Sequence, residues 1–167
     1  DAEAELAQRL TVLAATPRQG GMPVRGDVDS IIDGIERARN ISFAPLQRDA
    51  VRTAATSNLL ILTGGPGTGK TTTVQGIIDM FSRLRMSVLL CAPTGRAAKR
   101  LSETTGIEAR TIHRLLEFNP HNGKFTRHEG DPLGTHAVIM DEASMVDTLL
   151  MNDFLRALRE DTTLVVV

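Results

Sequence analysis

The sequence predicts a three-layer α/β fold with a parallel β-sheet, and three observations support this prediction. The chain of 167 residues is 41% hydrophobic and 23% charged, an ordinary globular composition with enough length for one substantial core. Four short apolar runs alternate with segments of helical periodicity, which is typical of βαβ units and of strands buried on both faces. A glycine-rich pattern of the phosphate-binding type directly follows the first run.

Residues 1–41 are expected to form a short helical segment, which is either a linker or the end of an upstream domain. Residues 42–167 are expected to form the α/β domain. Two helices are expected there, with a loop rich in Gly and Pro between them. Their apolar side chains repeat at helical spacing, at Leu6, Leu10 and Leu13 and at Val28, Ile31, Ile32 and Ile35. Asp27 is expected to be the N-cap of the second helix. The chain starts without Met and stops in an apolar run, so we expect a fragment.

The α/β domain is expected to begin with a helix from Pro45. The expected strands are residues 59–62, 88–92, 138–140 and 164–167, and helical stripes cover residues 74–84 and 150–158. Between the second and third strands, Asn122-Gly123 lies between apolar positions, which predicts a β-hairpin within about residues 115–130.

Several classes of protein and site are excluded by composition and spacing. No apolar run approaches the roughly 20 residues of a membrane helix, and the first residues lack a secretory pattern, so we expect a cytoplasmic chain without membrane contact. The single Cys91 cannot form an internal disulfide. The histidines lack the close spacing of zinc ligands. The net charge is only -1, but residues 92–114 carry +3, which allows a local basic face.

Residues 64–71 match the phosphate-binding loop in full, between a strand and a helix as the pattern requires. Glycines let successive backbone N–H groups surround a phosphate, and the helix that follows presents its positive end to the same anion. Lys70 is expected to contact the β and γ phosphates, and Thr71 to offer its hydroxyl to Mg²⁺. The predicted nucleotide-binding residues of this stretch are Gly65, Pro66, Gly67, Thr68, Gly69, Lys70, Thr71 and Thr72.

Two carboxylates follow the third expected strand, where open α/β sheets bind their ligands. Asp141 is expected to hold Mg²⁺, and Glu142 to orient and deprotonate the attacking water. A simple nucleotide kinase has no need of a water base. The pair therefore indicates hydrolysis of ATP, with Lys70 and Glu142 as the catalytic residues.

Four runs in the same order resemble the RecD-like branch of superfamily 1 DNA helicases, of the RecD2 and exodeoxyribonuclease V α-subunit type. They are residues 62–73, 92–101, 111–116 and 140–147, within a resemblance that spans residues 42–167. The resemblance implies the first RecA-like motor domain of an ATP-dependent helicase in recombination and repair. It also implies 5′ to 3′ movement on single-stranded DNA, duplex unwinding, and a monomer or a subunit of a helicase–nuclease complex.

The resemblance assigns further residues. Gln47 would read the adenine edge, for which an amide can both donate and accept a hydrogen bond. The DNA-binding residues it implies are Pro93, Thr94, Gly95, Arg96, Thr111 and His113. The hairpin would be the pin that splits the duplex. Aromatic content of 3% favours a grip through phosphates over base stacking.

Two alternatives remain open at this point. The chain could be the helicase segment of a conjugative relaxase, whose nucleophilic Tyr would lie elsewhere because this chain contains no Tyr. It could also be a module in which ATP switches DNA or protein affinity without productive unwinding. In the family that this sequence resembles, a second motor domain supplies an arginine finger that speeds hydrolysis. We therefore expect this chain alone to bind nucleotide but to hydrolyse it slowly.

Overall fold

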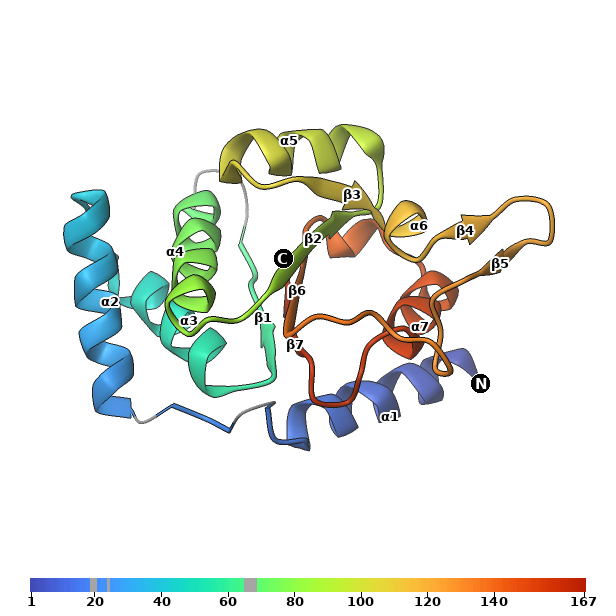
Figure 1. Cartoon of the computed structure of the whole chain (residues 1–167), viewed down its shortest axis with the longest axis horizontal. Coiled ribbons are helices and arrows are strands. Elements are labelled where there is room, and N and C mark those ends of the chain that lie inside the picture. Colours follow the sequence, from blue (N-terminus) through green and yellow to red (C-terminus); the bar gives the residue numbers. More distant parts are fainter. Residues whose placement is uncertain (19–20, 24, 65–68) are drawn as a thin grey trace.

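A parallel sheet of five strands forms the centre of the fold (Figure 1). The computed structural model describes residues 1–18, 21–23, 25–64 and 69–167. The strands lie in the order β1-β7-β6-β2-β3, and each neighbouring pair is parallel. Their bounds are β1 (Leu59–Ile61), β2 (Val88–Ala92), β3 (Ala109–Thr111), β6 (Ala137–Met140) and β7 (Thr163–Val166). The predicted parallel α/β fold is confirmed.

Helices cover both faces of this sheet, which makes the three layers. The bounds are α1 (Ala2–Ala15), α2 (Arg25–Arg39), α3 (Pro45–Thr56), α4 (Lys70–Arg83), α5 (Gly95–Thr105), α6 (Ile112–Leu115) and α7 (Thr148–Arg156). Figure 1 shows α2, α3 and α4 on one side of the sheet and α1 and α7 on the other. A 3₁₀ turn, η1 (Ala143–Met145), joins β6 to α7.

The central strand β6 shows why the sequence selects this arrangement. All four of its residues are buried. Ala137 and Ile139 pack into the core beneath α2, α3 and α4, whereas Val138 and Met140 pack into the core beneath α1 and α7. Successive side chains of a strand point to opposite faces, so an unbroken apolar run requires cover on both sides.

The two N-terminal helices pack directly onto the α/β layers. Leu13 of α1 is buried in one core with Phe154 and Leu155 of α7, and Val28 and Ile32 of α2 are buried in the other. The prediction that Asp27 is an N-cap is wrong, because α2 begins two residues earlier and Asp27 lies in its first turn. A carboxylate there still favours the helix dipole.

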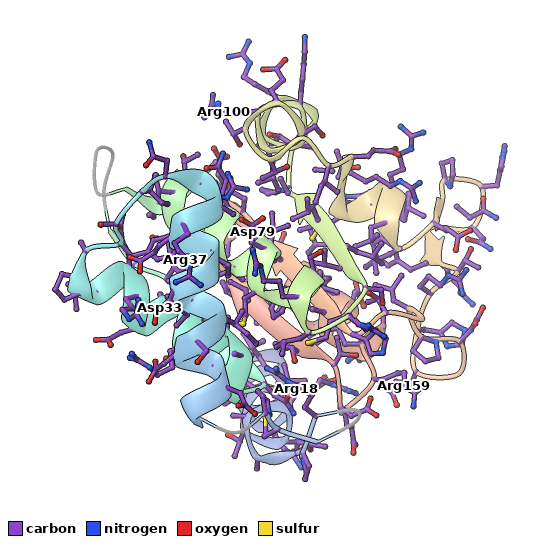
Figure 2. The ribbon with its side chains drawn as sticks, turned by 60° about the vertical axis from the view of Figure 1, so that its left-hand side comes forward. Arg18, Asp33, Arg37, Asp79, Arg100 and Arg159 are labelled. Atoms are coloured by element: carbon purple, nitrogen blue, oxygen red, sulfur yellow. The ribbon has the colours of Figure 1, made fainter. Side chains whose placement is uncertain are left out.

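The Arg18 side chain fastens the segment after α1 to the end of α3. Its guanidinium donates hydrogen bonds to the carbonyl oxygens of Ala54, Ala55 and Ser57, at 2.5, 2.5 and 2.8 Å. The carbonyls of Ala54 and Ala55 lie in the last turn of α3, and that of Ser57 lies at its C-cap, where the helix has no internal partner for them. Burial lowers the pKa of Arg18 to about 10, so the side chain remains a cation at neutral pH. Figure 2 shows it at the lower side of the molecule.

Strand β3 and the short helix α6 were not predicted. Residues 109–111 read Ala-Arg-Thr and carry no apolar run, and the strand is held at the sheet edge by its pairing with β2. Its hydrogen-bonding partner is distant in the sequence, so periodicity gives no signal.

The predicted hairpin is present and projects from the body of the molecule (Figure 1). Its strands are β4 (Phe118–Asn119) and β5 (Lys124–Phe125), paired antiparallel. Gly123 has a φ of 67° at the end of the connection, and its N–H donates to the Asn119 carbonyl at 2.9 Å. A glycine takes this left-handed conformation without a steric penalty. Within the described part of the chain, no helix has the length and apolar character needed to cross a membrane.

Candidate nucleotide and nucleic-acid site

The sequence motifs meet along the edge where the parallel strands end. Met140, the last residue of β6, pairs with Cys91 of β2, and the Asp141 N–H donates to the Cys91 carbonyl at 2.9 Å. Ala92, the last residue of β2, pairs with Thr111 of β3. The acidic pair, the start of α5 and the start of α6 therefore follow one another along one edge of the sheet.

The end of the phosphate-binding loop leads directly into α4. The predicted nucleotide-binding residues Gly65, Pro66, Gly67 and Thr68 lie outside the described residues. Gly69 has a φ of 76° and is the N-cap of α4, and its carbonyl accepts hydrogen bonds from the Thr73 N–H and hydroxyl, both at 3.1 Å. Lys70, Thr71 and Thr72 form the first helical turn, with Thr71 exposed.

A cavity of about 110 Å³ lies between α4, α5 and the end of β6. Three of the predicted site residues, Lys70, Thr71 and Asp141, line it together. Its other lining residues are Val74, Leu101, Thr104, Thr105 and Val167. The cation and hydroxyl of the adjacent Lys70 and Thr71 are thus neighbours of the Asp141 carboxylate around one space, although Asp141 comes much later in the sequence.

Gln47 lies in the first turn of α3 and reaches the end of the phosphate-binding loop. Its Nε2 atom donates to the Gly69 carbonyl at 3.2 Å, and its Oε1 atom accepts from the Ala44 N–H at 2.8 Å. An amide has two N–H donors and two acceptor lone pairs. One donor and one acceptor position of Gln47 are used in these two contacts.

Glu142 has an unusual backbone. Its φ of 53° and ψ of 42° place it in the left-handed region, which non-glycine residues rarely occupy and which is found disproportionately at functional sites. The Glu142 N–H donates to the Asp141 Oδ1 atom at 2.8 Å. The Glu142 carboxylate is not among the groups that line the cavity, and its Oε1 atom lies 3.5 Å from the Arg100 Nη1 atom of α5.

The predicted DNA-binding residues of the second motif form the start of α5. Thr94 is the N-cap, and its hydroxyl accepts a hydrogen bond from the Ala97 N–H at 3.2 Å. Gly95 and Arg96 are exposed in the first turn, and Pro93 is half-buried just before it. The opposite face of α5 packs against the sheet, so the first turn and its positive dipole end face solvent.

Thr111 and His113, the other predicted DNA-binding residues, lie at the start of α6. The Thr111 hydroxyl accepts from the Arg114 N–H at 3.2 Å and so caps the helix. His113 is exposed. Its ring lies 5.3 Å from that of Phe118 and 5.6 Å from that of Phe125, measured between centroids.

This ring cluster of His113, Phe118 and Phe125 was missed by the sequence analysis. The two phenylalanine rings are 5.1 Å apart across the hairpin, and Phe118 is 37% exposed. The overall aromatic content of 3% does not reveal this cluster, because composition carries no information on where the rings lie. The pair of Phe residues on either side of Asn-Gly was the available signal. The contact between Arg100 and Glu142 had no sequence signal.

Comparisons with known proteins agree on the type of domain. A family model described as an AAA domain matches residues 47–167. The chain is 39% identical over 156 residues to the ATP-dependent RecD2 DNA helicase of Deinococcus radiodurans, and the match covers 93% of this chain and 21% of that protein. It is also 37% identical over 145 residues to the RecBCD enzyme subunit RecD of Mycolicibacterium smegmatis, and this match covers 72% of this chain and 26% of that protein.

The fold is also similar to a solved structure. The crystal structure of Pif1 helicase from Candida albicans matches with a TM-score of 0.51 and 24% identity, over 75% of this chain and 32% of that one. This chain therefore spans about a fifth to a quarter of the curated relatives named above.

Proposed function

The chain belongs to the AAA domain family as a superfamily 1 DNA helicase motor domain of the RecD type, and on this premise we propose that it couples ATP hydrolysis to movement along single-stranded DNA. The observation that carries the proposal is the cavity shared by Lys70, Thr71 and Asp141. Residues in the C-terminal half of α5 line it, whereas the starts of α5 and α6, which carry the candidate DNA contacts, follow β2 and β3 at the same edge of the sheet. One edge of the sheet would thus hold both ligands.

ATP binds with its phosphates at the start of α4, where Lys70 offsets their charge. The cavity is smaller than the roughly 300–1,000 Å³ of pockets that enclose whole ligands, so it suits the phosphate end of a nucleotide. The Thr71 hydroxyl and the Asp141 carboxylate are hard oxygen donors of the kind that Mg²⁺ prefers, and they would hold it. Bound there, Mg²⁺ would neutralise charge on the phosphate oxygens.

Glu142 orients the attacking water and accepts its proton, once the carboxylate is directed toward the γ phosphate. Gln47 recognises adenine with the N–H and the lone pair that its two backbone contacts leave available. The positions of these residues, next to the cavity and the loop that leads into it, support both proposed roles.

Single-stranded DNA lies along the starts of α5 and α6. The positive end of the helix dipole at the first turn of α5 suits a phosphate, and the exposed Arg96 adds a charge there. Thr111 and His113 contact the strand farther along the edge. Contacts of this kind do not read bases, so binding is independent of sequence.

The hairpin β4–β5 separates the two strands of a duplex end as the domain moves 5′ to 3′. Its projection from the body and its ring cluster support this role (Figure 1). The relatives described as RecBCD subunits support a place in recombination or repair, either as a monomer or within a helicase–nuclease complex.

The test is ATP turnover and unwinding by the full-length protein. We expect single-stranded DNA to stimulate turnover, Lys70→Ala to abolish it, and duplexes with a 5′ tail to be unwound in preference to those with a 3′ tail. DNA binding that responds to ATP without unwinding would favour the switched binding module. Turnover that is unchanged in Lys70→Ala would contradict the proposal.

A further inference from the structure

Arg100 joins the helix with the candidate DNA contacts to the candidate catalytic carboxylate. Its Nη1 atom is 3.5 Å from the Glu142 Oε1 atom, and the two side chains are 63% and 38% exposed. Arg100 comes from α5, at the surface of the molecule (Figure 2). The contact therefore crosses the boundary between the proposed DNA and nucleotide sites.

The Glu142 carboxylate is directed toward α5 and does not line the cavity that holds Lys70 and Asp141. Its backbone is fixed in the left-handed region, and its N–H is engaged by Asp141. With the backbone fixed, the partner of the side chain decides where the carboxylate points. In this structure that partner is Arg100.

Helix α5 contacts both proposed ligand sites. Its Leu101, Thr104 and Thr105 line the cavity, whereas its first turn carries Arg96. Arg96 and Arg100 are four residues apart, so they are neighbours on one face of the helix, and both are exposed. A DNA phosphate near Arg96 is therefore within one helical turn of Arg100.

We infer that Arg100 is a positioning residue that restrains Glu142 in the absence of DNA and releases it when a DNA phosphate binds the guanidinium. The inference rests on the proposed function, because it assumes that Glu142 acts on water and that DNA binds along α5. A guanidinium matches a phosphate at least as well as a carboxylate. The contact to Glu142 is single and exposed, so a phosphate can compete with it.

The experiment measures kcat and KM for ATP on the full-length protein, with and without single-stranded DNA. We expect Arg100→Ala to raise kcat without DNA by about two- to fivefold, the upper part of the range that an exposed ion pair supports. The stimulation by DNA should fall by a similar factor. KM for ATP should not change, because Arg100 does not line the cavity.

Two variants serve as controls. Arg100→Lys retains a cation at the position and should keep the low DNA-free kcat. Lys99→Ala removes the same charge from the same exposed stretch of α5, and should leave the DNA-free kcat at the wild-type value. A loss of general electrostatic attraction for DNA would affect both alanine variants alike, whereas release of Glu142 is specific to Arg100→Ala.

A gain in DNA-free turnover cannot arise from a damaged fold. A DNA-free kcat of Arg100→Ala equal to or below that of the wild type, with turnover still dependent on Lys70, would overturn this inference alone. Turnover that Lys70→Ala leaves unchanged would overturn the proposed function and the inference together.

Discussion

The Gln47 side chain donates a hydrogen bond to the carbonyl of Gly69, so the residue proposed to recognise adenine contacts the last glycine of the phosphate-binding loop. The two residues are 22 positions apart, on α3 and at the start of α4. A β-carbon built on Gly69 would lie 2.3 Å from the Gln47 Nε2 atom. This close approach links the base end and the phosphate end of the proposed nucleotide site.

The variant Gly69→Ala should therefore disturb both fold and binding. It places a side chain at a φ of 76° and against Gln47, so we expect a loss of about 1–2 kcal/mol in the free energy of unfolding and weaker ATP binding. Denaturant titration and nucleotide binding measure the two effects. Adding Gln47→Ala removes the clash but keeps the backbone strain, so the double variant should recover only part of the stability. Full recovery would contradict the role assigned to the left-handed backbone.

Substitution by alanine at two helical glycines should change the stability of the protein in different ways. A β-carbon on Gly76 of α4 would lie 2.6 Å from the Phe43 ring and 3.1 Å from Val51, in the core. We expect Gly76→Ala to destabilise the protein by about 1–3 kcal/mol through overpacking. In α2, a β-carbon on Gly34 meets only the flexible ends of arginine side chains, so the better helix propensity should make Gly34→Ala neutral or stabilising by up to about 1 kcal/mol. Thermal unfolding compares them, and equal losses would refute the packing argument.

Substitution of Glu142 should separate stability from turnover. Glu142→Gly relieves the left-handed strain and should raise the free energy of unfolding by about 1 kcal/mol, while ATP turnover is lost. Glu142→Gln keeps the strain and should lose turnover with no gain in stability. Both variants should still bind ATP, because Glu142 does not line the cavity. If both variants hydrolyse ATP at the wild-type rate, Glu142 is not the group that acts on water.

Loss of Arg18 should expose the dependence of α3 on its cap. Arg18→Met leaves the Ala54, Ala55 and Ser57 carbonyls without their buried donor, so we expect a loss of about 1–3 kcal/mol in unfolding free energy. The control is Arg37→Met, a change on the exposed surface of α2 (Figure 2), which should cost little. Equal stability of the two variants in denaturant would show that the cap is dispensable.

The hairpin should affect unwinding more than ATP turnover. Phe118→Ala removes one of the three clustered rings, none of which lines the cavity. We expect DNA-stimulated turnover to change less than twofold, whereas the unwinding rate should fall severalfold. A strand-displacement assay beside an ATPase assay measures the split. An equal fall in both rates would place the ring cluster in the coupling to ATP and not at the duplex end.

Much of the fold was predictable because its signals are local in sequence. The apolar runs predict β2 and β6 closely, the glycine-rich pattern predicts the start of α4 at Lys70, and Asn-Gly predicts the hairpin. By contrast, β3 reads Ala-Arg-Thr and exists through its pairing with β2. The Arg18 cap joins segments 36 to 39 positions apart, and no periodicity indicates such a contact.

The sequence alone determined the chemical groups of the site: a glycine-rich loop, a lysine and threonine behind it, and two carboxylates after an apolar strand. These depend on residue type and on local backbone geometry. The tertiary structure decided which groups meet. It brings Lys70 and Asp141 to one cavity and turns Glu142 toward Arg100, because strand order and register set the distances between residues that are far apart in the chain.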